Sequence, residues 1–256
     1  MAEKAHPRGF LRRIAVATLA MVVLPLCAHA VYRVQQGGPS SYWEADWSSS
    51  GQLPRAVDSP AAMVRVYAAR TGRWKGIFAV HTWIVVKDRN GTAYQRFDKV
   101  GWGSPLRVNA YAADGRWYSN KPYTVYAADG KNAEQLIPAI RAAVRAYPYR
   151  KYGDYGLWPG PNSNTFTACV LAAVPQLRAT LPPTAIGKDY PCNGRWFSLR
   201  RTGKGFRLSL GGLAGINAGW IDGLEINALG AIIGLDIRRP ALKLPGFGRI
   251  GMALNP

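Results

Sequence analysis

The sequence predicts an α+β protein in which an antiparallel sheet packs against two helices and an antiparallel β meander follows. Three observations support this fold class. Residues 63–67 alternate apolar and polar side chains like a half-buried strand. Asn90-Gly91 is a strong hairpin signal between two apolar runs. Two stretches after residue 130 carry apolar side chains at helical spacing.

Length and composition indicate a globular chain. The 256 residues are 48% apolar and 18% charged, which is enough to bury a sizeable core. We expect residues 1–30 to be a signal peptide or an N-terminal membrane anchor. Residues 31–60 are predicted to form a linker or irregular arm, and residues 61–256 a single α+β domain with a β-rich part over about 205–237.

The N-terminus has the pattern of an export signal. An apolar run over 14–26 follows a positively charged segment, and Ala28-His29-Ala30 matches an Ala-x-Ala cleavage site. The positive charges are those of Arg8, Arg12 and Arg13. We therefore expect a protein that is periplasmic or anchored to the outer face of the inner membrane.

Cleavage is not decided by the sequence. The apolar run is short for a spanning helix, which favours a cleaved signal. Val31 and Tyr32 extend the apolar stretch past His29, so an uncleaved anchor that associates with the membrane stays open. A lipoprotein signal at Cys27 is a third alternative, which the bulky Leu26 disfavours.

The charge narrows the choice of partners. The chain carries a formal net charge of +19, and its basic residues are scattered without a nucleic-acid-binding motif. We therefore expect no nucleic-acid partner. An exported basic protein meets anionic lipid headgroups or cell-wall polymers first, so an anionic envelope component is the expected partner.

The first half of the domain is predicted to contain four strands. Thr71-Gly72 and Asn90-Gly91 separate three of them, and a glycine- and aromatic-rich loop over 104–122 precedes the fourth. The expected strands cover residues 63–67, 77–87, 92–100 and 123–127.

Two helices are expected next. The first begins at Asn132, where Gln135 would complete a capping box, and ends before Pro148. The second covers about 163–173. Cys169 lies on its apolar face and could pair with Cys192 in an oxidising compartment, or remain an inert thiol.

The last third is rich in Leu, Ile and Gly, interrupted by acids and amides that are costly in lipid and argue against a spanning helix. We expect a meander, with a lipid-contacting surface as the alternative. The residues after 238 are expected to wrap the surface. The meander strands are expected over 206–210, 215–220, 224–229 and 231–236.

His81 is the candidate catalytic base. It is the only histidine after residue 30, which excludes a multi-histidine metal site, and we expect no metal and no cofactor. A hairpin at Asn90-Gly91 would place His81, Trp83, Arg96 and Asp98 on one sheet face. Asp98 would then be near enough to orient the imidazole. A structural histidine is the plainer interpretation.

Ser163 is the candidate nucleophile, because it opens the second helix, where backbone N–H groups favour developing negative charge. The plainer interpretation is helix capping. Asn162, Ser163 and Asn164 are all suitable caps.

The order of these elements resembles circularly permuted papain-like proteins, including the lecithin:retinol acyltransferase group and the PPPDE-type isopeptidases. The segment Asn162-Ser163-Asn164-Thr165-Phe166 is similar to their nucleophile segment, with Ser163 in place of cysteine. The resemblance implies a papain-like fold, Ser163 as nucleophile and His81 as base. Asn162 or Asn164 would then help to bind the oxyanion.

The chain also resembles a bacterial family known as domain of unknown function 3750. That resemblance implies no activity. It rests on the segments Ala69–Gly76, His81–Val86, Trp158–Phe166 and Leu242–Arg249.

Two functions follow as alternatives. The first is a hydrolase or acyltransferase that uses His81, Ser163 and Asp98 on acyl or amide bonds of envelope material. The second is a non-catalytic protein that binds an anionic envelope ligand in an aromatic cleft, with basic residues such as Arg96. The cleft would be lined by Trp83, Trp102, Trp117 and Trp158. A third alternative, with Cys169 as nucleophile, is disfavoured because that residue lies inside the helix.

Overall fold

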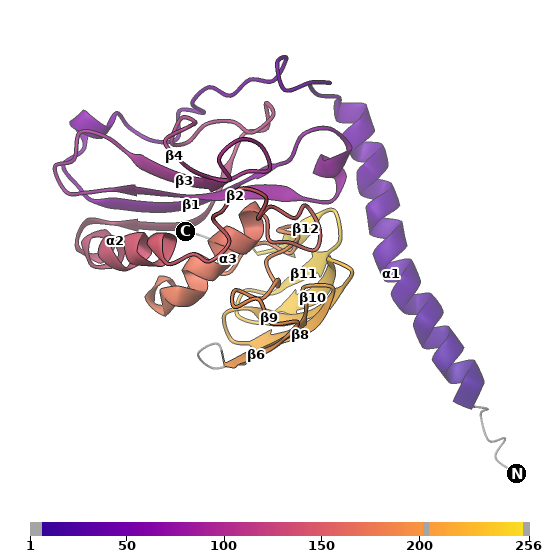
Figure 1. The fold of residues 1–256 in the computed structure, drawn as a ribbon. Coiled ribbons are helices and arrows are strands. Elements are labelled where there is room, and N and C mark those ends of the chain that lie inside the picture. Colours follow the sequence, from indigo (N-terminus) through magenta and orange to yellow (C-terminus); the bar gives the residue numbers. More distant parts are fainter. Residues whose placement is uncertain (1–6, 202–204, 253–256) are drawn as a thin grey trace, which may run out of the picture.

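The computed structural model describes residues 7–201 and 205–252. A long N-terminal helix, α1 (Pro7–Gln36), stands beside a five-stranded antiparallel sheet and a seven-stranded antiparallel sheet (Figure 1). Two further helices, α2 (Gly130–Arg145) and α3 (Ser163–Ala173), lie against the first sheet. The predicted α+β class, with a C-terminal antiparallel meander, is confirmed.

The first sheet has the strand order β4-β3-β2-β1-β5. Its strands are β1 (Met63–Arg70), β2 (Val80–Lys87), β3 (Gln95–Lys99), β4 (Leu106–Val108) and β5 (Tyr123–Asp129). Short 3₁₀ turns lie at Ala56–Asp58, Arg73–Ile77 and Pro175–Leu177. Strand β4 falls in a segment that was expected to be only a loop.

The β2–β3 register agrees with the prediction. Ile84 pairs with Phe97 and Val85 with Arg96, as expected for a hairpin at Asn90-Gly91. Asn90 has a φ of 55°, and the Gly91 N–H donates to the Asp88 carbonyl at 3.0 Å. Strand β3 starts three residues later than predicted, so the connection is longer than a tight turn.

Helices α2 and α3 cover one face of the first sheet. Val66 and Ile84 point to this face and pack with Ile137 of α2 and Phe166 of α3 in one core. The opposite face buries Trp83 and other aromatic side chains. The first sheet therefore separates two hydrophobic cores, and successive side chains along a strand point alternately into one core and the other.

Helix α2 begins earlier than the sequence predicted. Its N-cap is Asp129, and no side chain caps it, so the capping box expected at Asn132 and Gln135 is wrong. Gly130 has a φ of +57°, which allows β5 to turn directly into the helix.

The second sheet is an uninterrupted meander in the order β12-β11-β10-β9-β8-β7-β6. The four strands predicted for this region are present. The strands are β6 (Phe197–Arg201), β7 (Gly205–Leu210), β8 (Ala214–Gly219), β9 (Gly223–Ala228), β10 (Ala231–Asp236), β11 (Ala241–Leu244) and β12 (Gly248–Gly251).

The chain after residue 238 adds strands to this sheet, so the expectation of an irregular surface tail is wrong. Leu242 pairs with Leu235 of β10, and Ile250 pairs with Leu242. The cause is backbone pairing with the open edge of β10, which composition alone does not reveal.

Helix α1 is docked by its C-terminal half. His29 is buried, its Nδ1 lies 2.6 Å from the Ile77 carbonyl, and its ring meets Phe247 edge-on at 5.1 Å. The helix contacts β10 and β11. Within the described residues, we find no helix with both the length and the apolar character needed to cross a bilayer.

One disulfide joins α3 to the segment that follows it. Cys169 and Cys192 are bonded, with their Cα atoms 5.7 Å apart. The paired state, one of two alternatives from the sequence, is therefore the one observed. Cys169 as a free thiol nucleophile is wrong, because its sulfur is already bonded.

Candidate functional site

His81, Asp98 and Arg96 form a hydrogen-bonded row on one face of the first sheet. The His81 Nε2 lies 2.9 Å from Asp98 Oδ1. Arg96 donates two hydrogen bonds to the same carboxylate, from Nε to Oδ2 at 2.7 Å and from Nη2 to Oδ1 at 2.9 Å. The predicted contact between His81 and Asp98 is therefore present. The bidentate contact with Arg96 holds the Asp98 carboxylate in its orientation.

Aromatic rings enclose this row. The His81 ring stacks on Trp117, with centroids 3.6 Å apart and planes 4° apart. The Arg96 guanidinium lies 4.1 Å from the centre of the Trp83 ring. All five residues are buried. The arrangement is that of a packed core, where a substrate has no access.

Electrostatics keep the row in one protonation state. Burial lowers the pKa of His81, although the hydrogen bond to Asp98 opposes this shift. Burial alone would raise the pKa of Asp98, but the Arg96 charge and the bonds from both partners hold it at about 2. At neutral pH the row is an ion pair with a neutral imidazole beside it.

Ser163 lies on the other face of the sheet. Thr82 follows His81 in β2 and therefore points to the opposite side. Its hydroxyl donates to Asn164 Oδ1 at 3.0 Å and lies 3.4 Å from the Ser163 carbonyl oxygen. Because the sheet separates His81 from Ser163, the predicted nucleophile–base pair is not formed.

Asn162 is the N-cap of α3, as the capping interpretation proposed. Its Oδ1 accepts from the N–H groups of Asn164 and Thr165, and Thr165 completes a capping box. The side-chain amides of Asn162 and Asn164 both donate to the carbonyl of Ile186, and their second N–H groups donate to the carbonyls of Leu157 (from Asn162) and Val80 (from Asn164). Both amides are thus occupied by backbone, so their predicted role as oxyanion donors has no free hydrogen.

Ser163 itself is a buried residue in the first turn of α3. Among the hydrogen bonds of the described residues, none involves its hydroxyl group. The serine is therefore neither the cap nor a member of the His81 row.

The predicted aromatic cleft is not assembled. Trp83 and Trp117 are core residues, and Arg96 is buried beneath them. Trp158 is exposed, and its Nε1 donates to the Leu229 carbonyl at 3.0 Å, which places it against the second sheet. The described residues also contain no group of three His, Cys, Asp or Glu side chains arranged to hold a metal.

The second sheet has polar side chains on its inner face. In β9, Glu225 and Asn227 are buried while Leu224 and Ile226 are exposed, the reverse of ordinary patterning. Asn217 of the adjacent strand β8 and Lys243 of β11, two strands away, continue the inner polar set.

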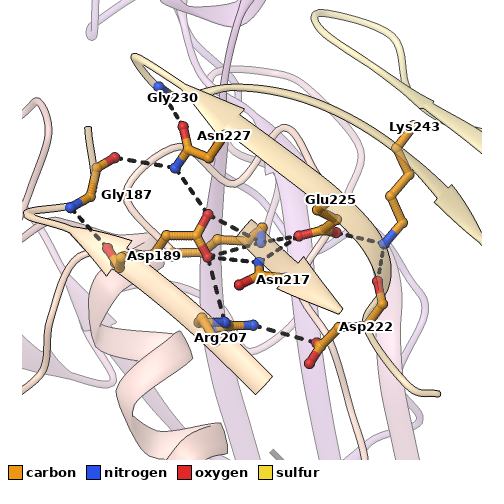
Figure 2. Close-up of polar contacts among 12 residues, drawn as sticks. Gly187, Asp189, Arg207, Asn217, Asp222, Glu225, Asn227, Gly230 and Lys243 are labelled. Carbon is orange, nitrogen blue, oxygen red and sulfur yellow. Dashed lines mark hydrogen bonds and ion pairs between the residues drawn. The ribbon is translucent and has the colours of Figure 1, made fainter. Parts of the chain in front are cut away.

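An ionic cluster occupies this inner face. Glu225 is its centre, and it accepts from Lys188 Nζ at 2.6 Å, Lys243 Nζ at 2.5 Å and Asn217 Nδ2 at 2.8 Å (Figure 2). Asp189 accepts from Lys188 at 3.1 Å. Because each carboxylate faces basic partners, the pKa values of Glu225 and Asp189 are lowered despite burial, which alone would raise them.

The cluster joins the second sheet to the segment that precedes it in the chain. Lys188 and Asp189 come from the segment before the second sheet, whereas the remaining members lie on its strands or turns. Arg207 adds an ion pair to Asp222 at 3.4 Å, and the Asn227 amide donates to Asp189 at 3.1 Å. The charges balance within the cluster, so we assign it a structural role.

The outer face of the second sheet is apolar across all seven strands. Register places Ile226 between Ile216 and Ile233, and Leu235 between Leu224 and Leu242. Many of these side chains are well exposed, Ile226 by 56% and Leu242 by 51%. We call this set the outer face: Phe197, Leu199, Phe206, Leu208, Leu210, Ala214, Ile216, Ala218, Leu224, Ile226, Ala228, Ala231, Ile233, Leu235, Leu242 and Ile250.

The sequence offered a lipid-contacting surface in this region only as an alternative, without its residues, and the ionic cluster was not predicted. The alternation in Leu224-Glu225-Ile226-Asn227 was the available signal, because it divides the strand into an apolar and a polar side. Alternation does not say which side is buried.

Together these features define the chain as an α+β protein whose second sheet is polar inside and apolar outside. The chain belongs to the family described as protein of unknown function (DUF3750), whose model matches residues 61–190. The match covers the first sheet, both covering helices and the start of the ionic cluster. It ends before Leu242–Arg249, one of the segments on which the family resemblance rested.

No curated protein and no solved structure matches the chain. The family match therefore carries the identification alone, and the likeness to papain-like proteins receives no support from these comparisons.

Proposed function

We propose that the protein is a non-enzymatic protein of the cell envelope that binds an anionic membrane surface through the outer face. The observation that carries the proposal is the exposure of apolar side chains on all seven strands. Soluble monomers rarely expose a large contiguous apolar patch unless a partner or a membrane covers it. These side chains are about half exposed, so covering each would contribute about half of the roughly 1.5–3 kcal/mol that full burial of a large apolar side chain provides.

The charge and the aromatic residues favour a lipid surface as the occupant. A chain with a net charge of +19 is attracted to anionic headgroups and repelled by a second copy of itself. Trp196 and Trp220 flank the strands and are exposed by 64% and 56%. Tryptophan favours the boundary between headgroups and acyl chains.

Helix α1 offers a second set of exposed apolar side chains. Leu19 and Leu24 are exposed by 63% and 67%, and the same helix contacts β10 and β11. The disulfide between Cys169 and Cys192 fits an oxidising compartment. Together these features favour a location on the periplasmic side of the inner membrane.

The test is co-sedimentation of the full chain with vesicles of phosphatidylglycerol and, separately, of phosphatidylcholine. We expect stronger binding to the anionic vesicles, weakened by added salt. A stable dimer in the absence of lipid, with no vesicle binding, would assign the outer face to a second copy and overturn the proposal.

A hydrolase or acyltransferase acting through Ser163 and His81 is the second candidate. The hydrogen bond between His81 and Asp98 favours it, and the separation of His81 from Ser163 by the sheet counts against it. Any hydrolysis of lipid esters or muropeptides by the wild-type chain should therefore survive in Ser163→Ala. A loss of turnover in Ser163→Ala and His81→Ala alike would restore the catalytic assignment.

A further inference from the structure

The outer face contains a hollow at one end of β7, β8 and β9. Its volume is about 720 Å³, within the roughly 300–1,000 Å³ of small-molecule sites. Five apolar side chains line it, together with glycines: Phe206, Ala218, Trp220, Leu224 and Ile237.

Three glycines lie at the strand ends beside the hollow. Gly205 pairs with Gly219, and Gly219 pairs with Gly223 across the three strands. A Cβ on Gly223 would lie 2.2 Å from the Leu235 carbonyl oxygen, and one on Gly205 would lie 2.3 Å from that of Ala218. The strands therefore approach each other too closely at Gly205 and Gly223 for a residue with a side chain.

The hollow has an apolar interior, and one exposed basic residue follows its lining in the chain. Ile237 lines the hollow, and the next residue, Arg238, is exposed. Trp220 is 56% exposed at the edge, with a ring suited to the region between acyl chains and headgroups. An apolar chain with an anionic head matches both parts.

We propose that this hollow holds one acyl chain of an anionic membrane phospholipid, with its phosphate near Arg238. The proposal rests on the proposed function, because the hollow belongs to the face that would lie on the membrane. The sheet would then bind the bilayer by its whole outer face and hold a single lipid at one end.

The test is calorimetric titration of the full chain with lysophosphatidylglycerol below its micelle concentration. Ala218→Leu places three more heavy atoms in the hollow and should weaken binding about tenfold. Ala139→Leu makes the same change at an exposed position of α2 and should leave binding as in the wild type. Arg238→Ser should weaken lysophosphatidylglycerol binding while leaving lysophosphatidylcholine binding unchanged.

The outcomes separate the two proposals. Equal binding by the wild type and Ala218→Leu, with normal unfolding midpoints for both, would overturn the hollow as the site. Vesicle binding by a wild type that does not bind lysophosphatidylglycerol would overturn the hollow and leave the proposed function standing. If the wild type binds neither vesicles nor the single-chain lipid, both proposals fail.

Discussion

Ile226→Asp should lower the affinity of the protein for phosphatidylglycerol vesicles by roughly 10- to 100-fold. Ile226 lies on the central strand β9 of the outer face and is 56% exposed. In the free protein a carboxylate there stays in water, so the fold should be retained. On the membrane the same carboxylate would lose its water and meet anionic headgroups. Co-sedimentation over a range of lipid concentrations measures the change.

Val57→Asp is the matched control. Val57 is exposed by 57% and lies in the segment before the first sheet, outside the outer face. The same substitution there adds the same negative charge, so any loss of binding common to both variants reports net charge alone. If Val57→Asp and Ile226→Asp weaken binding equally, the outer face is not the contact surface.

Glu225→Gln should lower the free energy of unfolding by about 3–5 kcal/mol. The substitution keeps the shape of the side chain but removes the charge that faces Lys188 and Lys243, both of which are buried. These ammonium groups would remain out of water without their carboxylate partner. Denaturant unfolding at constant m-value measures the loss.

The matched control is Glu134→Gln on α2. Glu134 lies 4.0 Å from Arg89 in a pair whose side chains are well exposed, so its loss should stay within about 1 kcal/mol. A change of less than 1 kcal/mol in Glu225→Gln would show that the ionic cluster does not hold the second sheet to the segment that precedes it.

The same cluster should make the protein sensitive to acid. The pKa values of Glu225 and Asp189 are lowered below their unfolded values of about 4.5 and 3.8. Their contribution is therefore complete above those unfolded values and is lost as the pH falls through the lower folded ones. The decline in unfolding free energy below about pH 4.5 should be shallower in Glu225→Gln.

Most of the secondary structure could be predicted because local signals control it. The residue range of α3 follows from its N-cap and its apolar residues, and the β2–β3 register follows from the turn at Asn90. The strands β11 and β12 could not be predicted. They are short, and they depend on pairing with β10 rather than on any pattern of their own.

Of the candidate site, only the contact between residues of one hairpin could be predicted. Register brought His81 to Asp98, since both lie on one hairpin. Whether Ser163 lies near His81 depends on which face of the sheet α3 covers. Strand alternation places His81 and Thr82 on opposite faces but does not say which of the two faces the helix. The residues of the outer face could not be assigned for the same reason, because alternation in β9 does not reveal that Glu225 is inside and Ile226 outside.

The most direct test of the outer face is to place a spin label on it and measure what surrounds the label. Cys27→Ser removes the free cysteine, and single cysteines at Leu242 and Val57 then carry the label. On phosphatidylglycerol vesicles, the label at Leu242 should become accessible to oxygen and shielded from a water-soluble nickel reagent, while the label at Val57 stays water-accessible. A label at Leu242 that remains water-accessible on vesicle-bound protein would contradict membrane binding through the outer face.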